Sequence, residues 1–333
     1  MIRNQWYAVL ESREVKKGKM LGVKRLGERL LFWRGTDGKV VCLVDTCPHR
    51  GAQLSHGKIV DGHVQCPFHG LEFAANGDCV YVPSIGRAAG AQAKFNASAY
   101  PVLERHGFIF LYWGEVEKDE ALPPLGWLDE LPHDEFAYTT VVDHWKVDYS
   151  RVIENQLDVA HLWLVHHNTI GRGNRRVVDG PMVEWYHEWS EPTILNIWVS
   201  NRKDDGATTG KKPKQVEKPP RHPSLQLRMP NLWQNWISED MRVVAAFVPI
   251  DAENSRMYFR YYQRILKAPI LRELFLAAAW VMNLRIERQD KRVVETQMPK
   301  RSDLDIGEKL FPADYPILEY RRRRRALIEK NNS

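Results

Sequence analysis

Two short segments of the sequence combine cysteine and histidine at spacings that suit a metal centre. The first begins at Cys47 and reads C-P-H-R-G, and the second begins at Cys66 and reads C-P-F-H-G, so the histidines are His49 and His69. Two thiolates and two imidazoles can hold either a tetrahedral zinc ion or a 2Fe-2S cluster with both sulfurs on one iron. Each segment supplies one residue of each type, whereas zinc modules usually pair like ligands. The pattern therefore favours the cluster over zinc or coincidence.

A second group of metal-binding side chains lies in the largely apolar segment from residue 151 to 167. Asp158, His161 and His166 interrupt this run, and burying them without partners would be costly. On an ideal helix Asp158 and His161 are about 60° apart, but His161 and His166 differ by about 140°, too far for two ligands on a straight helix. We expect either a π-type turn or a helix that ends just before His166. Two histidines beside an aspartate favour iron over a satisfied core histidine.

The third ligand is expected to be a carboxylate, because two histidines and one carboxylate form a facial triad that leaves coordination positions open. The helix predicted over residues 276–297 offers Glu287, Asp290 and Glu295. Asp290 lies on an apolar stripe of this helix, where an uncompensated anion would be expensive. Asp290 is therefore the predicted ligand. Glu287 is the main rival, and a surface salt bridge is the alternative without a metal.

The elements that must position these residues fall into two domains and a linker. Residues 1–114 read as a small all-β domain of short strands with Gly and Asp turns, and residues 115–135 read as a linker. Residues 136–333 mix strand-like and helical runs, which predicts an α+β domain with helices packed on an antiparallel sheet. The strand-like runs are 136–147, 182–200 and 241–265, the helical runs are 150–165, 269–297 and 315–330, and 202–223 is predicted as a mobile surface loop.

The net charge, the cysteine content and the lack of a long apolar segment limit the possible partners and location of the protein. The chain has a formal net charge of +6 and four cysteines, of which Cys42 and Cys79 lie outside the two segments and are expected to be small buried hydrophobes. The run Arg321–Arg325 falls in the predicted C-terminal helix, where such a run is usually a solvated face. Docking of an acidic electron-transfer partner suits the charge better than nucleic acid, for which no motif is present. No membrane span or signal peptide is recognisable, so a cytoplasmic protein is expected.

The two Cys-His segments resemble the Rieske signature of oxygenases and Rieske ferredoxins. Neither segment has the extra cysteine found beside the loops of respiratory Rieske proteins. Asn155, Asp158, His161 and His166 match the motif N-x-x-D-x-x-H-x4-H of Rieske non-heme iron oxygenase α subunits, and the segment from Asp290 to Gln297 approximates their later iron-binding Asp followed by V-x-E-x-Q. The chain therefore resembles the terminal oxygenase component of the aromatic ring-hydroxylating and O-demethylase-like family, over nearly its whole length.

This resemblance implies an N-terminal Rieske domain followed by a catalytic domain with mononuclear Fe(II). The implied ligands are Cys47, His49, Cys66 and His69 for the 2Fe-2S cluster, and His161, His166 and Asp290 for the mononuclear iron. It also implies a homotrimer in which the cluster of one subunit lies near the iron of its neighbour. The implied catalytic residues are Asp158, which would bridge His69 of the adjacent subunit to His161, and Asn155, a nearby polar residue.

The implied activity is that of an oxidoreductase that uses O2 and electrons from a separate NAD(P)H-dependent reductase, either a ferredoxin or a flavin-dependent one, because the sequence has no Gly-rich dinucleotide motif. The reaction would be hydroxylation or demethylation of a small organic, aromatic or cyclic substrate by a monooxygenase. The alternatives are an arene cis-dihydroxylating dioxygenase and a non-enzymatic Rieske electron carrier, which the intact triad disfavours. Trp189, Trp198, Trp233 and Trp236 are candidate pocket walls, although aromatic residues on strands more often belong to a core.

Overall fold

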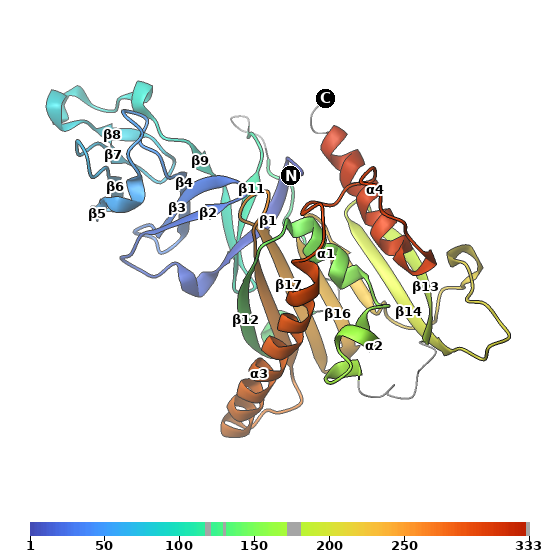
Figure 1. Ribbon diagram of the computed structural model, residues 1–333. Coiled ribbons are helices and arrows are strands. Elements are labelled where there is room, and N and C mark those ends of the chain that lie inside the picture. Colours follow the sequence, from blue (N-terminus) through green and yellow to red (C-terminus); the bar gives the residue numbers. More distant parts are fainter. Residues whose placement is uncertain (117–120, 129–130, 172–180, 331–333) are drawn as a thin grey trace. The chain divides into compact units, whose positions relative to one another are not determined.

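The computed structural model describes residues 1–116, 121–128, 131–171 and 181–330 (Figure 1). The chain forms two compact units. The first unit is Arg3–Leu122, and the second consists of Met1–Ile2 and Pro123–Ser333. The division falls inside the segment predicted as a linker, while the first two residues belong with the second unit. None of the helices in the described part of the chain has the length and apolar character that a membrane span needs.

The first unit is built from three small antiparallel sheets, as the short strand-like runs predicted. Their strand orders are β1-β11-β10, β2-β3-β4-β9 and β5-β6-β7-β8. The strands are β1 Gln5–Glu11, β2 Leu21–Arg25, β3 Glu28–Arg34, β4 Val40–Val44, β5 Lys58–Val60, β6 His63–Gln65, β7 Glu72–Phe73, β8 Cys79–Tyr81, β9 Ala99–Tyr100, β10 Val102–Arg105 and β11 Phe108–Trp113. Cys42 and Cys79 are 1% and 0% exposed, which confirms that both are buried.

The second unit contains a seven-stranded antiparallel sheet with the order β12-β18-β17-β16-β15-β14-β13. Its strands are β12 Ala137–Trp145, β13 Pro181–Glu191, β14 Ile194–Lys203, β15 Leu225–Arg228, β16 Leu232–Ser238, β17 Met241–Pro249 and β18 Ser255–Gln263. Side chains alternate between the two faces of each strand, so Met257, Phe259 and Tyr261 of β18 share one face. The predicted α+β fold with an antiparallel sheet is confirmed. Two residues assigned to the predicted surface loop, 202 and 203, instead extend β14.

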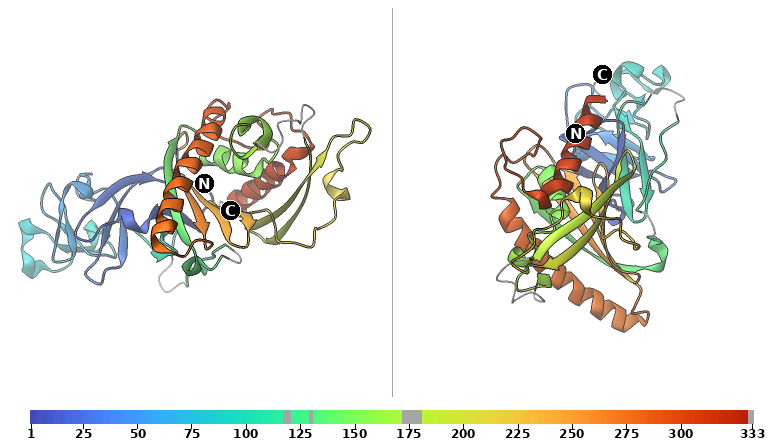
Figure 2. Two further views of the ribbon diagram at one scale, coloured as in Figure 1. Left: turned by 90° about the horizontal axis from the view of Figure 1, so that it is seen from below. Right: turned by 90° about the vertical axis from the view of Figure 1, so that its right-hand side faces the viewer.

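The helices of the second unit gather on one side of the sheet, as Figures 1 and 2 both show. They are α1 Tyr149–Leu157, α2 Leu162–Val165, α3 Pro269–Val294 and α4 Tyr315–Lys330. Helix α1 contacts β17 and β18, α3 contacts β12 and β18, and α4 contacts α1. The core between these layers includes Trp145, Ile153 and Phe247, each fully buried. Helices α1, α2 and α3 therefore lie on one face of the sheet and can direct side chains toward it.

The arginine run lies in α4 as expected, but its prediction as a solvated face is wrong at two positions. Arg321 and Arg324 are each 3% exposed. Nε and Nη2 of Arg321 donate to the carboxylate of Glu154 on α1 at 2.7 and 2.9 Å, and Arg324 donates to the backbone carbonyl of Ser302. Residues three apart share one face of a helix, and this face of α4 turns inward. These two charges are used inside the protein, where Arg321 connects α4 to α1.

Candidate metal centres and substrate cavity

Cys47 and Cys66 begin two loops of the same construction. The N–H of each cysteine donates to the carbonyl five residues later, at 2.7 and 2.8 Å. The glycine four residues after each cysteine returns a hydrogen bond to the carbonyl of that cysteine, at 2.8 Å for Gly51 and 3.1 Å for Gly70. These glycines have φ of 73° and 75°, a region that other residues rarely adopt. The glycine that ends each sequence motif is thus required by the geometry of the loop.

The four predicted cluster ligands divide into a buried pair and an exposed pair. Cys47 and Cys66 are 2% and 3% exposed, whereas His49 and His69 lie at the surface with ring centroids 4.6 Å apart. Burial raises the pKa of the Cys47 thiol to about 11, against the N–H groups of His49 and Arg50, which lower it. A cluster with sulfurs on its inner iron and imidazoles on its outer iron fits this arrangement.

The structure brings His161, His166 and Asp290 together in the second unit. One ligand atom from each of the three lies within 4.8 Å of the others. Oδ1 of Asp290 is 3.3 Å from Nε2 of His161 and 3.0 Å from Nε2 of His166. The rings of the two histidines have centroids 5.3 Å apart. Glu287, the rival carboxylate, is not part of this group.

The two histidines meet because the predicted helix over 150–165 is broken. Helix α1 ends at Leu157, and Asp158 has an extended conformation with φ −78° and ψ 116°. Its carboxylate accepts hydrogen bonds from the N–H groups of Ala160 at 2.8 Å and His161 at 3.3 Å, which compete with continuation of the helix. His166 caps the end of the short helix α2. The angle of about 140° between His161 and His166 holds only on one straight helix, and the chain is broken between α1 and α2. His166 lies just beyond the end of α2, which is one of the two arrangements that the sequence predicted.

Residues that the sequence had not singled out hold His166 in place. Nδ1 of His166 lies 3.0 Å from Oε1 of Gln289, which also accepts a hydrogen bond from the Thr169 hydroxyl at 2.7 Å. Metal-bound histidines usually donate their other N–H in this way, which leaves Nε2 free. Gly171 is required here, because a Cβ would lie 2.8 Å from the carbonyl of Leu162 and 2.9 Å from that of His166. The position of Gln289 directly before Asp290 was the available signal.

The electrostatics of the three-residue group favour an ionised carboxylate. Burial raises the pKa of Asp290, but hydrogen bonds from His161 and His166 outweigh it and lower that pKa. Burial lowers the pKa of His161, yet Asp158 and Asp290 outweigh it and raise that pKa to about 9. Oδ2 of Asp158 is 3.5 Å from Nδ1 of His161, an ion-pair distance rather than a well-formed hydrogen bond. Nδ2 of Asn155 is also 3.5 Å from Asp290.

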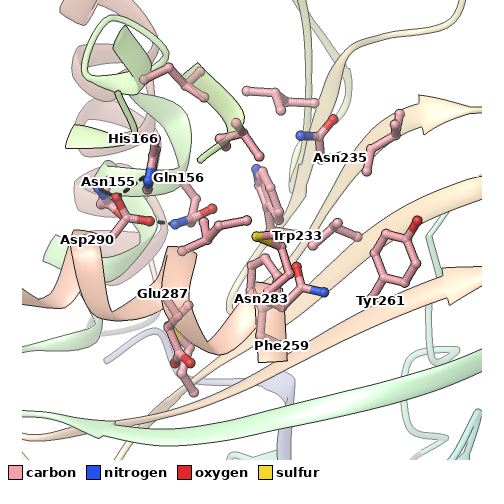
Figure 3. Close-up of a pocket in the computed structure, with 18 of the residues that line it drawn as sticks. Asn155, Gln156, His166, Trp233, Asn235, Phe259, Tyr261, Asn283, Glu287 and Asp290 are labelled. Carbon is pink, nitrogen blue, oxygen red and sulfur yellow. Dashed lines mark hydrogen bonds and ion pairs between the residues drawn. The ribbon is translucent and has the colours of Figure 1, made fainter. Parts of the chain in front are cut away.

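A cavity of about 450 Å³ opens beside this group, between the sheet and helices α1, α2 and α3 (Figure 3). The predicted catalytic residues Asn155 and Asp158 and the predicted iron ligands His161, His166 and Asp290 all line it. Apolar side chains form much of its wall, among them Leu162, Trp233, Val243, Phe259, Phe275 and Met282. Most ligand sites are concave and mainly apolar with a few polar groups. Of the four tryptophans considered as pocket walls, Trp233 alone is among the described lining residues.

Glu287 lies in the wall of the same cavity but has a different environment from Asp290. It is 2% exposed, and both carboxylate oxygens are buried without a hydrogen-bond partner among the described residues. Burial raises its pKa to about 8, and the charge of Asp143 acts in the same direction. Figure 3 shows its carboxyl group apart from that of Asp290. A protonated side chain at neutral pH follows from this environment.

Two Cys-His loops on a β unit, followed by a His-His-Asp group beside a cavity in an α+β unit, are the arrangement of the Rieske oxygenase α subunits that the sequence resembles. Comparison with protein families agrees. Residues 5–98 match the Rieske 2Fe-2S domain, and residues 145–330 match the vanillate O-demethylase oxygenase C-terminal domain. The second match covers more than half of the chain, so the chain belongs to the vanillate O-demethylase oxygenase family and carries a Rieske 2Fe-2S domain.

Individual relatives point the same way. The dicamba O-demethylase oxygenase component of Stenotrophomonas maltophilia is 38% identical over 169 residues, which are 50% of this chain and 48% of the relative. The vanillate O-demethylase oxygenase subunit of a Pseudomonas species is 37% identical over 172 residues, 51% of this chain and 46% of the relative. The matched region thus spans about half the length of these relatives. A crystal structure of dicamba monooxygenase bound to dicamba shares the fold, with a TM-score of 0.73, 20% identity and coverage of 99% and 98% of the two chains.

Proposed function

We propose that the chain is a terminal oxygenase that hydroxylates or demethylates a small organic, aromatic or cyclic substrate with O2. The observation that carries this proposal is the group of His161, His166 and Asp290 at the wall of an apolar cavity, in a chain that also has a Rieske domain. Relatives named O-demethylase and N-alkylformylase oxygenase components support the same reaction class. Electrons would come from a separate ferredoxin or flavin-dependent reductase.

His161, His166 and Asp290 would hold a mononuclear Fe(II), because they form a 2-His-1-carboxylate set with buried, converging ligand atoms. A ferrous ion held there would supply the activation of O2. Gln289 holds Nδ1 of His166, which would leave Nε2 of that ring for the ion, and Asp158 would orient His161 from its Nδ1 side. The apolar wall limits access of water to the reacting groups.

We further propose that the enzyme is a cytoplasmic homotrimer in which Asp158 connects His69 of the adjacent subunit to His161. Asp158 supports this role because its side chain is 27% exposed while it contacts His161 from outside the metal-binding group. A mixed trimer tests it. Combining a His69→Ala chain with a His166→Ala chain should restore part of the activity that each variant lacks, since an intact cluster then meets an intact iron across some interfaces. A mixed trimer, verified by mass, that stays inactive would contradict the proposal.

The reaction itself is tested with the purified enzyme, its reductase and ¹⁸O2. About three irons per chain and a Rieske-type spectrum are expected. Release of formaldehyde that carries one labelled oxygen atom, with the second atom in water and the phenolic oxygen of the product unlabelled, supports O-demethylation. Two labelled atoms on adjacent ring carbons would instead identify a dihydroxylating dioxygenase. Cluster reduction without mononuclear iron and without any oxygenated product would identify an electron carrier.

A further inference from the structure

Two side-chain amides in the cavity wall are held in one orientation by their hydrogen bonds. Gln156 stands at the end of α1 and Asn283 on α3, and both line the cavity (Figure 3). An amide can present either its oxygen or its nitrogen to a ligand, and the partner of the other end decides which one. The partners of these two amides are therefore informative about what the cavity recognises.

The orientation of Gln156 is fixed by a chain of hydrogen bonds that begins at the carboxylate of Asp290. An ionised carboxylate only accepts, so the long contact of 3.5 Å between Asn155 and Asp290 Oδ1 favours the orientation in which Asn155 turns its NH2 group toward Asp290. Oδ1 of Asn155 is then the acceptor for Nε2 of Gln156, at 2.8 Å. This leaves Oε1 of Gln156 free, and Figure 3 shows this amide directed into the cavity. Gln156 consequently presents an acceptor to a ligand.

Asn283 also presents its amide oxygen to the cavity, for an independent reason. Its Nδ2 donates at 2.8 Å to the carbonyl of Ala279, one turn earlier on α3. A backbone carbonyl cannot donate, so the reversed amide would place two oxygens against each other. Oδ1 of Asn283 remains for the cavity, and the side chain is only 8% exposed. Two walls of the cavity thus offer acceptor oxygens among mainly apolar groups.

The charged side chains among the described lining residues are unfavourable for an anionic ligand. Among the described residues that line the cavity there is no lysine or arginine, while Asp158, Glu287 and Asp290 are acidic. Two positive charges of a ferrous ion would be balanced by Asp158 and Asp290, because Glu287 is largely protonated at neutral pH. An anionic group in this apolar space would meet no positively charged side chain among the described lining residues and would lose its hydration.

We propose that Gln156 Oε1 and Asn283 Oδ1 determine specificity by accepting hydrogen bonds from an N–H or O–H group of the substrate, and that the cavity rejects carboxylates. This inference rests on the proposed oxygenase function and names its substrate class. The substrate is a compact ring compound that keeps at least one donor group, such as a phenol, an aniline or an amide. Compounds of the same size with only acceptors leave the two oxygens unpaired in an apolar site.

The test uses methoxybenzenes that carry a second group, OH, NH2, OCH3 or COO⁻, at the 2, 3 or 4 position. Binding to the iron-loaded holoenzyme is measured by calorimetry without O2. The best phenol or aniline should bind roughly tenfold more tightly than the matching dimethoxybenzene, the order expected when a buried acceptor is left unpaired, and the carboxylates should bind least. Equal or tighter binding of dimethoxybenzenes or carboxylates, or no binding of any compound at millimolar concentration, would overturn the proposal.

Matched variants assign the effect to the two amides. Gln156→Met and Asn283→Leu keep the side-chain volume and remove the acceptor, so each should reduce the preference for donors toward equality. Asn235→Leu is the control, since Asn235 also lines the cavity but its amide has no side-chain hydrogen bond among the described residues. It should change the affinity for donors and acceptors alike. Unchanged preference in both test variants would overturn the role of the amides.

Calorimetry without turnover separates this inference from the oxygenase function. Donor-selective binding with no oxygenated product in the presence of reductase and O2 would contradict the proposed function and leave the recognition in place. Oxygenation of carboxylates by an enzyme with full iron would support the oxygenase function and contradict the proposed recognition. Iron content is determined in every variant, because Asn155 lies between Gln156 and Asp290.

Discussion

Replacing Arg321 by methionine should destabilise the second unit strongly, because Arg321 belongs to a closed set of four charges. Glu154 accepts hydrogen bonds from Arg321 at 2.7 and 2.9 Å and from Arg151 at 3.2 Å. Glu308 pairs with Arg321 at 2.6 Å and with Arg151 at 2.8 Å. Two positive and two negative groups therefore balance, and the side chains of Arg151, Glu154 and Arg321 are 1%, 6% and 3% exposed.

The magnitude follows from what each substitution leaves behind. Arg321→Met leaves Glu154 and Glu308 with one cation between them, and breaking a buried pair in this way costs about 3–5 kcal/mol. The double variant Arg321→Met with Glu154→Met leaves Arg151 paired with Glu308, so its charges balance again. Replacing both partners of a buried pair by apolar groups is often close to neutral. We therefore expect the double variant to be more stable than the Arg321→Met single variant by about 2 kcal/mol or more.

Urea unfolding of the holoenzyme provides the measurement, with fluorescence and cluster absorbance recorded in parallel because two units need not unfold together. The control is Arg322→Met in the same run, since Arg322 is exposed and forms a surface pair with Glu319 at 3.1 Å, worth less than about 1 kcal/mol. A double variant that is as unstable as Arg321→Met would refute the reasoning. The loss would then come from side-chain packing rather than from an unbalanced charge.

Three further predictions concern the metal-binding group and its surroundings. Glu287 has a folded pKa of about 8 against an ordinary 4.5, so the folded state holds a proton that the unfolded state releases, and stability falls as pH rises through this range. Between pH 6 and 9 this titration should lower the free energy of unfolding by about 3 kcal/mol, and Glu287→Gln should remove that decrease. Urea unfolding at both pH values measures it, and a variant with the same pH dependence as the parent protein would contradict the prediction. Asp290→Ala should lose mononuclear iron while the cluster absorbance stays, and Glu287→Ala should keep iron; metal analysis showing the opposite would move the ligand to Glu287. Asp158→Asn should retain both metal centres but cut turnover severely, because the anion that orients His161 is removed; full turnover would exclude that role.

The parts of the site that the sequence could predict are those that depend on local spacing. The two loops that begin at Cys47 and Cys66 repeat one construction, and each is closed by hydrogen bonds within six residues. Asp290 was selected by its place on an apolar stripe of one helix, and the structure places it beside His161 and His166. In each case the spacing of residues within one loop or one helix was sufficient for the prediction.

The features that the sequence did not predict depend on groups far apart in the chain. The end of α1 at Leu157 was missed because the Asp158 carboxylate bonds the next N–H groups, a choice that apolar periodicity does not report. The inward direction of Arg321 depends on Glu154, 167 positions away. Gln289 lies directly before the predicted ligand Asp290, but its contact with His166 is recognisable only once His166 is placed against α3. Charge runs in particular reveal their role only when their partners are known.

The last turn of α1 links stability to recognition. Glu154 bonds to Arg321 of α4, Asn155 to Asp290, Gln156 to Asn155, and Asp158 contacts His161, so consecutive residues point to α4, to the metal-binding group and to the cavity. A helix can satisfy all these contacts at only one rotation about its axis, because successive side chains are about 100° apart. The buried ion pair of Glu154 fixes that rotation from the side opposite the cavity. The same charges that hold α4 in place therefore also help to set the direction in which the Gln156 side chain faces the cavity.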